Sequence, residues 1–334
     1  MRVEADLSDD VDLERGLAEV DALAAKARAA VDAVVIGQSL VVEQSIITLL
    51  SGGHLLLVGA PGLAKTRLAE TLGAVFGLDE RRVQCTPDLM PADIIGSEVL
   101  EEGNDGRRHF RFIEGPVFTQ ILMADEINRA SPRTQSALLQ AMQEKKVAVS
   151  GVSRPLPEPF HVLATQNPIE QEGTYPLPEA QLDRFLMDVR ISYPARDDER
   201  SVLIATTGAE QTPAVQVMDA KTLMNAQSLI RRAPISDGVV DAILTLVRNG
   251  RPESSELDAV KRHLAWGPGP RAGQALMLAT RARAALDGRL APSVDDVAAL
   301  ARPVLRHRMA PTFAARAEGV GVDDVLDALV ASLS

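Results

Sequence analysis

The chain has 334 residues, a formal net charge of −11, 46% hydrophobic and 24% charged residues, which is typical of a globular protein of about two domains. No apolar run approaches the roughly 18 residues that a membrane span needs, and the acidic N-terminal residues show no secretory signal. The single cysteine, Cys85, excludes an internal disulfide, so we expect a cytoplasmic protein. The acidic balance and the 3% aromatic content argue against a broad nucleic-acid-binding surface.

The first 33 residues carry many acids and have apolar residues at helical spacing, which predicts one or two turns of packed amphipathic helix. A second apolar helix is predicted from about Val41 to Leu50. Residues 55–66 then read Leu-Leu-Leu-Val-Gly-Ala-Pro-Gly-Leu-Ala-Lys-Thr. This segment predicts a strand, a glycine-rich loop and the start of a helix.

A loop of this kind directs backbone N–H groups at one point, and the helix start adds partial positive charge, so the loop can hold a phosphate chain. Lys65 is then expected to reach the β and γ phosphates, and the Thr66 hydroxyl to bind Mg²⁺. The segment departs from the general phosphate-loop pattern because Ala64 stands at the second glycine position. Taken alone, it also fits a structural turn with a solvated lysine.

Four further apolar segments alternate with helical patterns, which predicts a parallel α/β sheet with strands near 82–85, 121–124, 161–165 and 185–189. Two interruptions predict β-hairpins near 97–113, with a turn at Asp105-Gly106, and near 146–153. These are either ordinary surface hairpins or substrate loops. Helical spacing dominates from about residue 200. We therefore divide the chain into an N-terminal helical segment (1–33), an α/β core (34–197) and a C-terminal helical domain (198–334).

The strand predicted at 121–124 ends in two acids, Asp125 and Glu126. Phosphoryl transfer to water needs a metal ion to neutralise phosphate charge and a base to activate the water. Asp125 would hold Mg²⁺, mainly through water, and Glu126 would be the general base. The alternative is that this acidic pair caps the helix that follows.

Three more polar residues are placed near predicted strand or helix ends. Asn167 follows the strand at 161–165 and could orient the same water or contact the γ-phosphate, although Asn-Pro is also a plain turn signal. Arg184 precedes the last strand, and Arg271 stands at a helix start after a Gly/Pro loop. The planar guanidinium suits phosphate oxygens, but either arginine could equally be solvated or paired with a carboxylate.

Five segments in this order resemble the MoxR family of AAA+ ATPases. They are Gly-Ala-Pro-Gly-Leu-Ala-Lys-Thr (59–66), Ala-Asp-Glu-Ile-Asn-Arg-Ala (124–130), Ala-Thr-Gln-Asn-Pro (164–168), Leu-Pro-Glu-Ala-Gln-Leu-Asp-Arg-Phe (177–185) and Gly-Pro-Arg-Ala (269–272). The resemblance spans about residues 30–310, and an alanine at position 64 looks normal for this family. It implies an AAA+ core with a five-stranded parallel sheet flanked by helices, a C-terminal all-α lid, and homo-hexamers with ATP between subunits.

The resemblance also implies roles for individual residues. Asn167 would be sensor 1, Arg184 the arginine finger acting on the neighbour's ATP, and Arg271 sensor 2, acting on its own or the next subunit's nucleotide. The two hairpins match a helix-2 insert and a pre-sensor-1 hairpin, both facing the ring pore. The catalytic set is Lys65, Glu126, Asn167 and Arg184, and the Mg²⁺ ligands are Thr66 and Asp125. The nucleotide would contact Ile36, Gly37, Gln38, Gly59, Ala60, Pro61, Gly62, Leu63, Ala64, Lys65, Thr66, Arg67 and Arg271.

The function implied is Mg²⁺-dependent ATP hydrolysis by a ring that remodels, matures or activates protein clients, with von Willebrand A-domain proteins or metal-dependent enzymes as partners. One alternative is a nucleic-acid motor, supported only by Arg107, Arg108, Arg111, Lys145 and Lys146. The other is a nucleotide switch without hydrolysis, which is disfavoured by the presence of Asp125, Glu126, Asn167 and Arg184.

Overall fold

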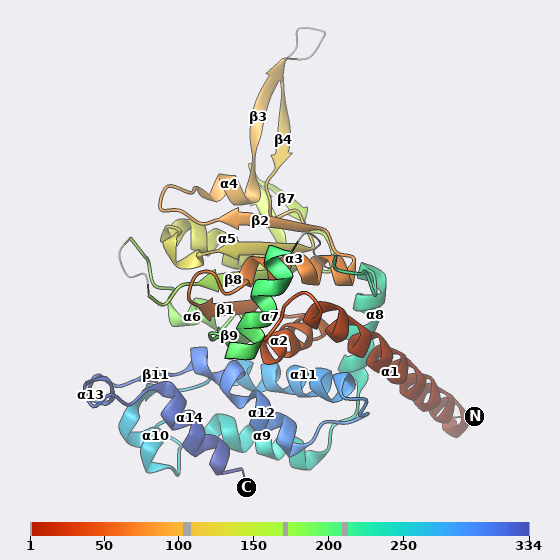
Figure 1. The fold of residues 1–334 in the computed structure, drawn as a ribbon, viewed down its shortest axis with the longest axis vertical. Coiled ribbons are helices and arrows are strands. Elements are labelled where there is room, and N and C mark those ends of the chain that lie inside the picture. Colours follow the sequence, from red (N-terminus) through yellow and green to blue (C-terminus); the bar gives the residue numbers. More distant parts are fainter. Residues whose placement is uncertain (1, 103–107, 170–172, 209–212, 334) are drawn as a thin grey trace.

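The core of the protein is a sheet of five parallel strands in the order β2-β5-β8-β1-β9 (Figure 1). The computed structural model describes residues 2–102, 108–169, 173–208 and 213–333, with side chains from residue 12 onward. The strands are β1 (Leu55–Gly59), β2 (Glu80–Gln84), β5 (Ile121–Asp125), β8 (His161–Gln166) and β9 (Met187–Ile191). The predicted α/β core with five parallel strands and a helical C-terminal region is confirmed.

The inner strands are continuous apolar runs because helices cover both faces of a parallel sheet. All five residues of β1 are buried, whereas β2 at the edge buries only Val83. Parallel strands need crossover connections: α3 (Lys65–Phe76) lies in the connection from β1 to β2, and α5 (Pro132–Glu144) lies in the one from β5 to its neighbour β8. Strand β9 begins two residues later than predicted, because Phe185 and Leu186 are buried in the loop before it.

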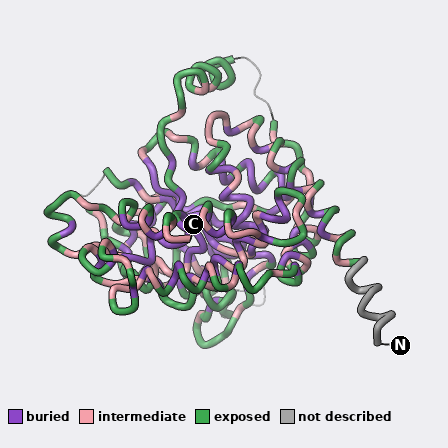
Figure 2. Tube along the Cα trace, turned by 90° about the horizontal axis from the view of Figure 1, so that it is seen from below, coloured by how far each residue is buried: buried purple, intermediate pink, exposed green. Residues whose placement is uncertain are grey.

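The N-terminal segment is one 31-residue helix, α1 (Arg2–Asp32), so the prediction of one or two turns was wrong. Its length follows from alanines that extend the apolar face: Ala24 and Ala27 are buried together with Val20 and Val31. The same core includes residues of α2 (Ser39–Leu50) and of the C-terminal helices. Figure 2 shows buried segments through the middle of the molecule and exposed ones around it.

Two hairpins interrupt the core. Strands β3 (Gly96–Glu102) and β4 (Arg108–Glu114) form a hairpin that projects from the body (Figure 1), and the predicted turn Asp105-Gly106 lies outside the described residues. Strands β6 (Lys146–Val149) and β7 (Val152–Pro155) form the second, turning at Ser150 and Gly151 with φ of +51° and +82°. The hairpins touch each other, because the Arg154 guanidinium lies 3.9 Å from the centre of the Phe112 ring and 3.7 Å from Glu98.

The C-terminal region is helical, and from α9 (Asp237–Asn249) onward it lies below the sheet in Figure 1. Helix α11 (Pro270–Leu286) places Arg271 in its first turn, as predicted. At the start of α12 (Val294–Leu305), Asp296 Oδ2 accepts the backbone N–H of Ser293 at 2.7 Å. A short antiparallel pair, β10–β11, was not predicted. The described helices include none that is both long and apolar enough to cross a membrane.

The remaining elements complete the chain. They are α4 (Pro91–Ile95), η1 (Ile127–Arg129), α6 (Glu179–Leu182), α7 (Arg196–Thr207), α8 (Ala220–Arg232), α9 (Asp237–Asn249), α10 (Asp258–His263), β10 (Leu264–Trp266), α11 (Pro270–Leu286), α12 (Val294–Leu305), η2 (Arg306–Arg308), β11 (Ala310–Pro311), α13 (Phe313–Ala317) and α14 (Val322–Ala331). Helix α7 spans the position 197/198 at which we divided the chain.

Candidate nucleotide-binding site

The loop between β1 and α3 has the backbone geometry of an anion cradle. Gly62 and Ala64 both have positive φ, +80° and +56°. A side chain at Gly59 would meet the Ile191 carbonyl oxygen 2.8 Å from its Cβ, so that position requires glycine. The Lys65 side chain, only 9% exposed, folds back over the loop and donates from Nζ to the Gly59 carbonyl at 2.6 Å. The start of α3 therefore carries a buried cation beside backbone N–H groups that favour an anion.

A cleft of about 450 Å³ lies beside this loop. It is lined by Ile36, Gly62, Ala64 and Arg67, four of the predicted nucleotide contacts. Of the neighbouring predicted residues, Gly37 packs against Asp198, and Gln38 donates from Nε2 to the Ser192 carbonyl at 2.9 Å. The far wall is formed by α7 through Val202, Ala205 and Thr206, which sequence reasoning missed.

The predicted acidic pair ends β5, the strand next to β8 in the sheet. Asp125 uses both carboxylate oxygens: Oδ1 accepts from Thr165 Oγ1 at 2.5 Å and Oδ2 accepts from Arg82 Nη2 at 2.5 Å. Thr165 is buried and also accepts the backbone N–H of Glu126 at 2.8 Å. Thr165 therefore fixes both acids at the carboxyl end of the sheet.

Glu126 has a left-handed backbone, with φ of +55°, which turns its side chain out of the strand direction. Its Oε2 accepts from Gln84 Nε2 at 3.1 Å and from Arg129 Nη1 at 3.0 Å. Glu126 immediately precedes η1 but makes no side-chain cap, so the capping alternative does not describe it. Nearby, burial and the charges of the two acids raise the pKa of Cys85 to about 12, so this thiol stays protonated at neutral pH.

Asn167 follows β8 and is buried, at the same carboxyl ends of the strands as the acids. Its Oδ1 accepts from the backbone N–H of Ile169 at 3.1 Å, the local bond expected of an Asn turn. The structure thus groups the loop, both acids and Asn167 at the carboxyl ends of the strands, where open α/β sheets bind ligands.

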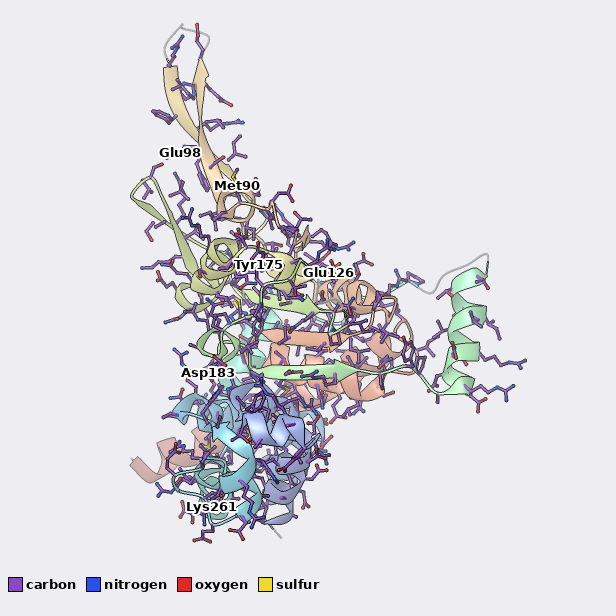
Figure 3. All side chains as sticks on the ribbon, turned by 90° about the vertical axis from the view of Figure 1, so that its left-hand side faces the viewer. Met90, Glu98, Glu126, Tyr175, Asp183 and Lys261 are labelled. Atoms are coloured by element: carbon purple, nitrogen blue, oxygen red, sulfur yellow. The ribbon has the colours of Figure 1, made fainter. Side chains whose placement is uncertain are left out.

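Arg184 and Arg271 lie elsewhere. Together with Arg308 they line a cleft of about 280 Å³ that includes Gly52–His54, the residues just before β1. Arg271 Nη1 is 3.6 Å from Asp183 Oδ2. Burial and the nearby Arg271 charge lower the pKa of Arg184, and its buried Nε has no hydrogen-bond partner among the described residues. Figure 3 shows Asp183 and Glu126 at opposite ends of the strands.

Sequence reasoning missed the residue that holds the Arg184 loop. Arg308, with a side chain 3% exposed, donates from Nε to Asp183 Oδ1 at 2.7 Å and from Nη2 to the Phe185 carbonyl at 2.7 Å. It also missed Thr165, Arg129, Arg82 and Gln84. The first two lie inside the motif segments, whereas Arg82 and Gln84 come from β2 with no motif to mark them.

The residues present fit a magnesium nucleotide. Thr66 is the second residue of α3 and Asp125 ends β5, which offers a hydroxyl and a carboxylate oxygen of the kind that Mg²⁺ binds. Within the described ranges, His, Cys, Asp and Glu form no cluster of three or more that could hold a metal.

Comparison with known proteins agrees with this arrangement. The ATPase family associated with various cellular activities (AAA) matches residues 54–187, and the AAA lid domain matches residues 257–329. The Mycobacterium tuberculosis protein named Chaperone MoxR1 is 39% identical over 90% of this chain and 79% of its own length. Protein MoxR of Paracoccus denitrificans is 32% identical over 92% of this chain and 94% of its own.

A solved structure shares the whole fold. The crystal structure of a candidate ATPase from Cytophaga hutchinsonii superimposes with a TM-score of 0.85 at 34% identity, and the match covers 99% of this chain and 98% of that one. Motifs, topology and relatives lead to one assignment. The chain belongs to the MoxR family of AAA+ ATPases.

Proposed function

We propose that this protein hydrolyses ATP with Mg²⁺ and that a ring of identical subunits uses hydrolysis to remodel protein clients. The observation that carries the ATPase proposal is the grouping of Lys65, Asp125 and Glu126 at the carboxyl ends of the inner strands β1 and β5. On ATP binding, the Lys65 ammonium would donate to the phosphates in place of the Gly59 carbonyl. The first turn of α3 would supply backbone N–H donors to the same phosphates. Mg²⁺, held by Thr66 and Asp125, would neutralise charge on the phosphates.

Glu126 is the proposed general base. Its carboxylate stands at the end of β5, held on one oxygen by Gln84 and Arg129, and takes a proton from the attacking water. Asn167, buried at the adjacent strand end, orients that water or the γ-phosphate. The cleft beside Ile36 and α7 receives the adenine.

The same geometry supports a second copy of the chain as the source of the arginines. A five-residue strand rises roughly 15 Å, so Arg184 at the amino end of the sheet is far from the phosphate loop that follows β1. Arg184, Arg271 and Arg308 share the cleft with one acid, Asp183, an arrangement that favours an anion. Arg184 and Arg271 therefore both serve the neighbour's ATP in the proposed ring.

The client half of the proposal rests on the relatives. A protein named as a chaperone shares 39% identity with this chain, and the two touching hairpins offer a client-contacting surface. Von Willebrand A-domain proteins and metal-dependent enzymes are the proposed clients. The nucleic-acid alternative loses support, because Arg108 and Arg111 pair with Glu102 and Glu101 at 3.8 and 3.1 Å, while Arg107 lies outside the described residues.

Three variants test the ATPase. Glu126→Gln is expected to lower turnover about 10²-fold or more, because the general base is removed. It should still bind ATP, because the phosphate-binding loop between β1 and α3 is intact. Lys65→Ala should lose binding, and Arg184→Ala should keep binding and lose turnover. Phosphate release and fluorescent-nucleotide binding measure the two properties. The matched control, Glu256→Gln, changes an exposed acid of the C-terminal region. Full steady-state hydrolysis by Glu126→Gln would contradict the base assignment.

A further inference from the structure

A polar pair on the edge strand reaches the metal-binding acid. Residues alternate along β2, so Arg82 and Gln84 share a face, and β2 runs beside β5 with Gln84 opposite Asp125. Arg82 Nη2 donates to Gln84 Oε1 at 2.9 Å and to Asp125 Oδ2 at 2.5 Å. The guanidinium thus lies against the carboxylate assigned to Mg²⁺.

Each of the two Asp125 carboxylate oxygens accepts one hydrogen bond, and the two donors differ greatly in burial. Oδ1 is held by Thr165, which is buried and is itself bonded to the Glu126 backbone. Oδ2 is held by Arg82, whose side chain is 47% exposed and comes from the edge of the sheet. Of the two, only Arg82 can move into solvent without breaking buried structure.

We propose that Arg82 neutralises Asp125 in the nucleotide-free protein and competes with Mg²⁺ for it, so that loading Mg·ATP exchanges the arginine for the metal. A guanidinium held against the carboxylate disfavours a divalent cation at the same group, because the two cations repel and the carboxylate charge is already compensated. Arg82 therefore raises the Mg²⁺ concentration at which the nucleotide complex forms. This inference rests on the proposed function, since it takes Asp125 as the metal-side acid.

The test measures metal binding apart from hydrolysis. A fluorescent ATP analogue is bound to the full chain, first in excess chelator and then in a Mg²⁺ titration. Arg82→Gln is expected to leave affinity in chelator within about twofold and to lower half-saturating Mg²⁺ about fivefold, the size expected of one partly exposed ion pair. Arg82→Lys keeps a cation without the planar guanidinium, so its half-saturating Mg²⁺ is expected to lie between the values for the wild type and Arg82→Gln.

Arg81→Gln is the matched control. Arg81 is the adjacent residue of β2, on the opposite face, 3.9 Å from Asp79, and its loss should leave the Mg²⁺ requirement unchanged. An unchanged or higher Mg²⁺ requirement in Arg82→Gln overturns the proposal, and so does loss of binding in chelator, which would make Arg82 a phosphate ligand. If Arg82→Gln does not fold, Arg82→Lys carries the same comparison. A wild-type protein that binds no nucleotide would instead contradict the proposed function.

Discussion

Ala64 holds a backbone conformation that alanine rarely adopts. Its φ of +56° and ψ of +22° lie in the left-handed region, where an L-residue with a Cβ is disfavoured by roughly 1–2 kcal/mol relative to its usual conformation. Its side chain is exposed and so contributes little packing to offset that strain. The loop tolerates the cost because this turn aims successive N–H groups at one anion. The departure from glycine in the sequence thus has a structural counterpart.

Replacing Ala64 with glycine should relieve this strain. Glycine also gives the unfolded chain more conformational freedom, which lowers the free energy of unfolding by about 0.4–1 kcal/mol. The two effects together predict that the free energy of unfolding of Ala64→Gly stays unchanged or rises by up to about 1.6 kcal/mol. Ala60, in the same loop, does not have positive φ, and Ala60→Gly should lower the free energy of unfolding by up to about 1 kcal/mol. Urea unfolding measures both. Equal losses in the two variants would contradict strain at Ala64.

The elements that the sequence predicts well are those whose signals are local. The apolar runs of β1, β5 and β8 are buried as expected, and the acids that end β5 stand at its carboxyl end. The start of β9 was misplaced because Phe185 and Leu186 look like strand residues. They are buried by tertiary contacts instead: the Leu186 N–H donates to the His54 carbonyl at 2.8 Å.

The parts of the site that the sequence did not predict depend on packing between distant elements. Arg82 reaches Asp125 only because β2 pairs with β5 in this register. Arg308 reaches Asp183 across 125 residues, from a turn after α12 to the loop before β9. The sequence around a single arginine does not predict which acid it pairs with, since most arginines are solvated or paired at the surface. A motif therefore marks groups at strand ends, while their supporting residues appear only in the folded chain.

Two buried histidines tie the amino ends of β1 and β8 to neighbouring elements. His54 Nδ1 accepts the Val162 N–H at 3.0 Å, so its proton is on Nε2, which faces the Met142 carbonyl of α5. His161 donates from Nδ1 to the Gly53 carbonyl at 2.8 Å. Burial, first of all, lowers the pKa of His54 to about 3 and that of His161 to about 4. Both are neutral in the folded protein at neutral pH.

Acid should destabilise the protein through these histidines. Below pH about 6.5 the unfolded chain takes up protons that the folded chain does not, so the free energy of unfolding falls by up to about 1.4 kcal/mol per pH unit per histidine. The loss continues as pH falls toward the folded pKa values of about 4 and about 3. Between pH 7.5 and 5.5 these two histidines together should lower the free energy of unfolding, measured in urea, by about 2.7 kcal/mol. Buried His307, whose pKa is also lowered, should add to this loss. Equal stability at the two pH values would rule this out.

A variant separates the titration from the packing. In His161→Asn the side-chain amide can still donate to the Gly53 carbonyl, but it does not titrate. Its stability should therefore change less between pH 7.5 and 5.5 than that of the wild type, whatever its absolute value. The matched control, His109→Asn, makes the same exchange at an exposed side chain of β4, outside the buried core.

At the scale of the whole molecule, the C-terminal helices share a core with the sheet domain. One continuous apolar cluster includes Val31 of α1, Ile46 of α2, Leu276 of α11 and Leu300 of α12. Arg271 and Arg308 are therefore positioned against the Arg184 loop by packing, and all three belong to one face of the subunit. The phosphate loop and the acids belong to the opposite end of the strands. Each subunit thus carries two different halves of the proposed site.

Mixing two inactive variants tests this arrangement. Glu126→Gln keeps the arginine face and loses the base, whereas Arg184→Ala keeps the loop and the base and loses the arginine. In a randomly mixed ring of equal parts, about a quarter of the interfaces join an intact base to an intact arginine, because the contact is head-to-tail. Phosphate release should therefore recover toward a quarter of the wild-type rate, from a background that each variant shows alone.

The control for mixing is the double variant Glu126→Gln with Arg184→Ala. Mixed with Glu126→Gln alone, it supplies no intact base, so no interface is complete and release should stay at background. Co-purification through a tag on one variant shows whether subunits exchange. If tagged and untagged subunits co-purify and the first mixture still gives only background release, then Arg184 does not complete the neighbour's site, because a complete interface would have formed at about a quarter of the contacts.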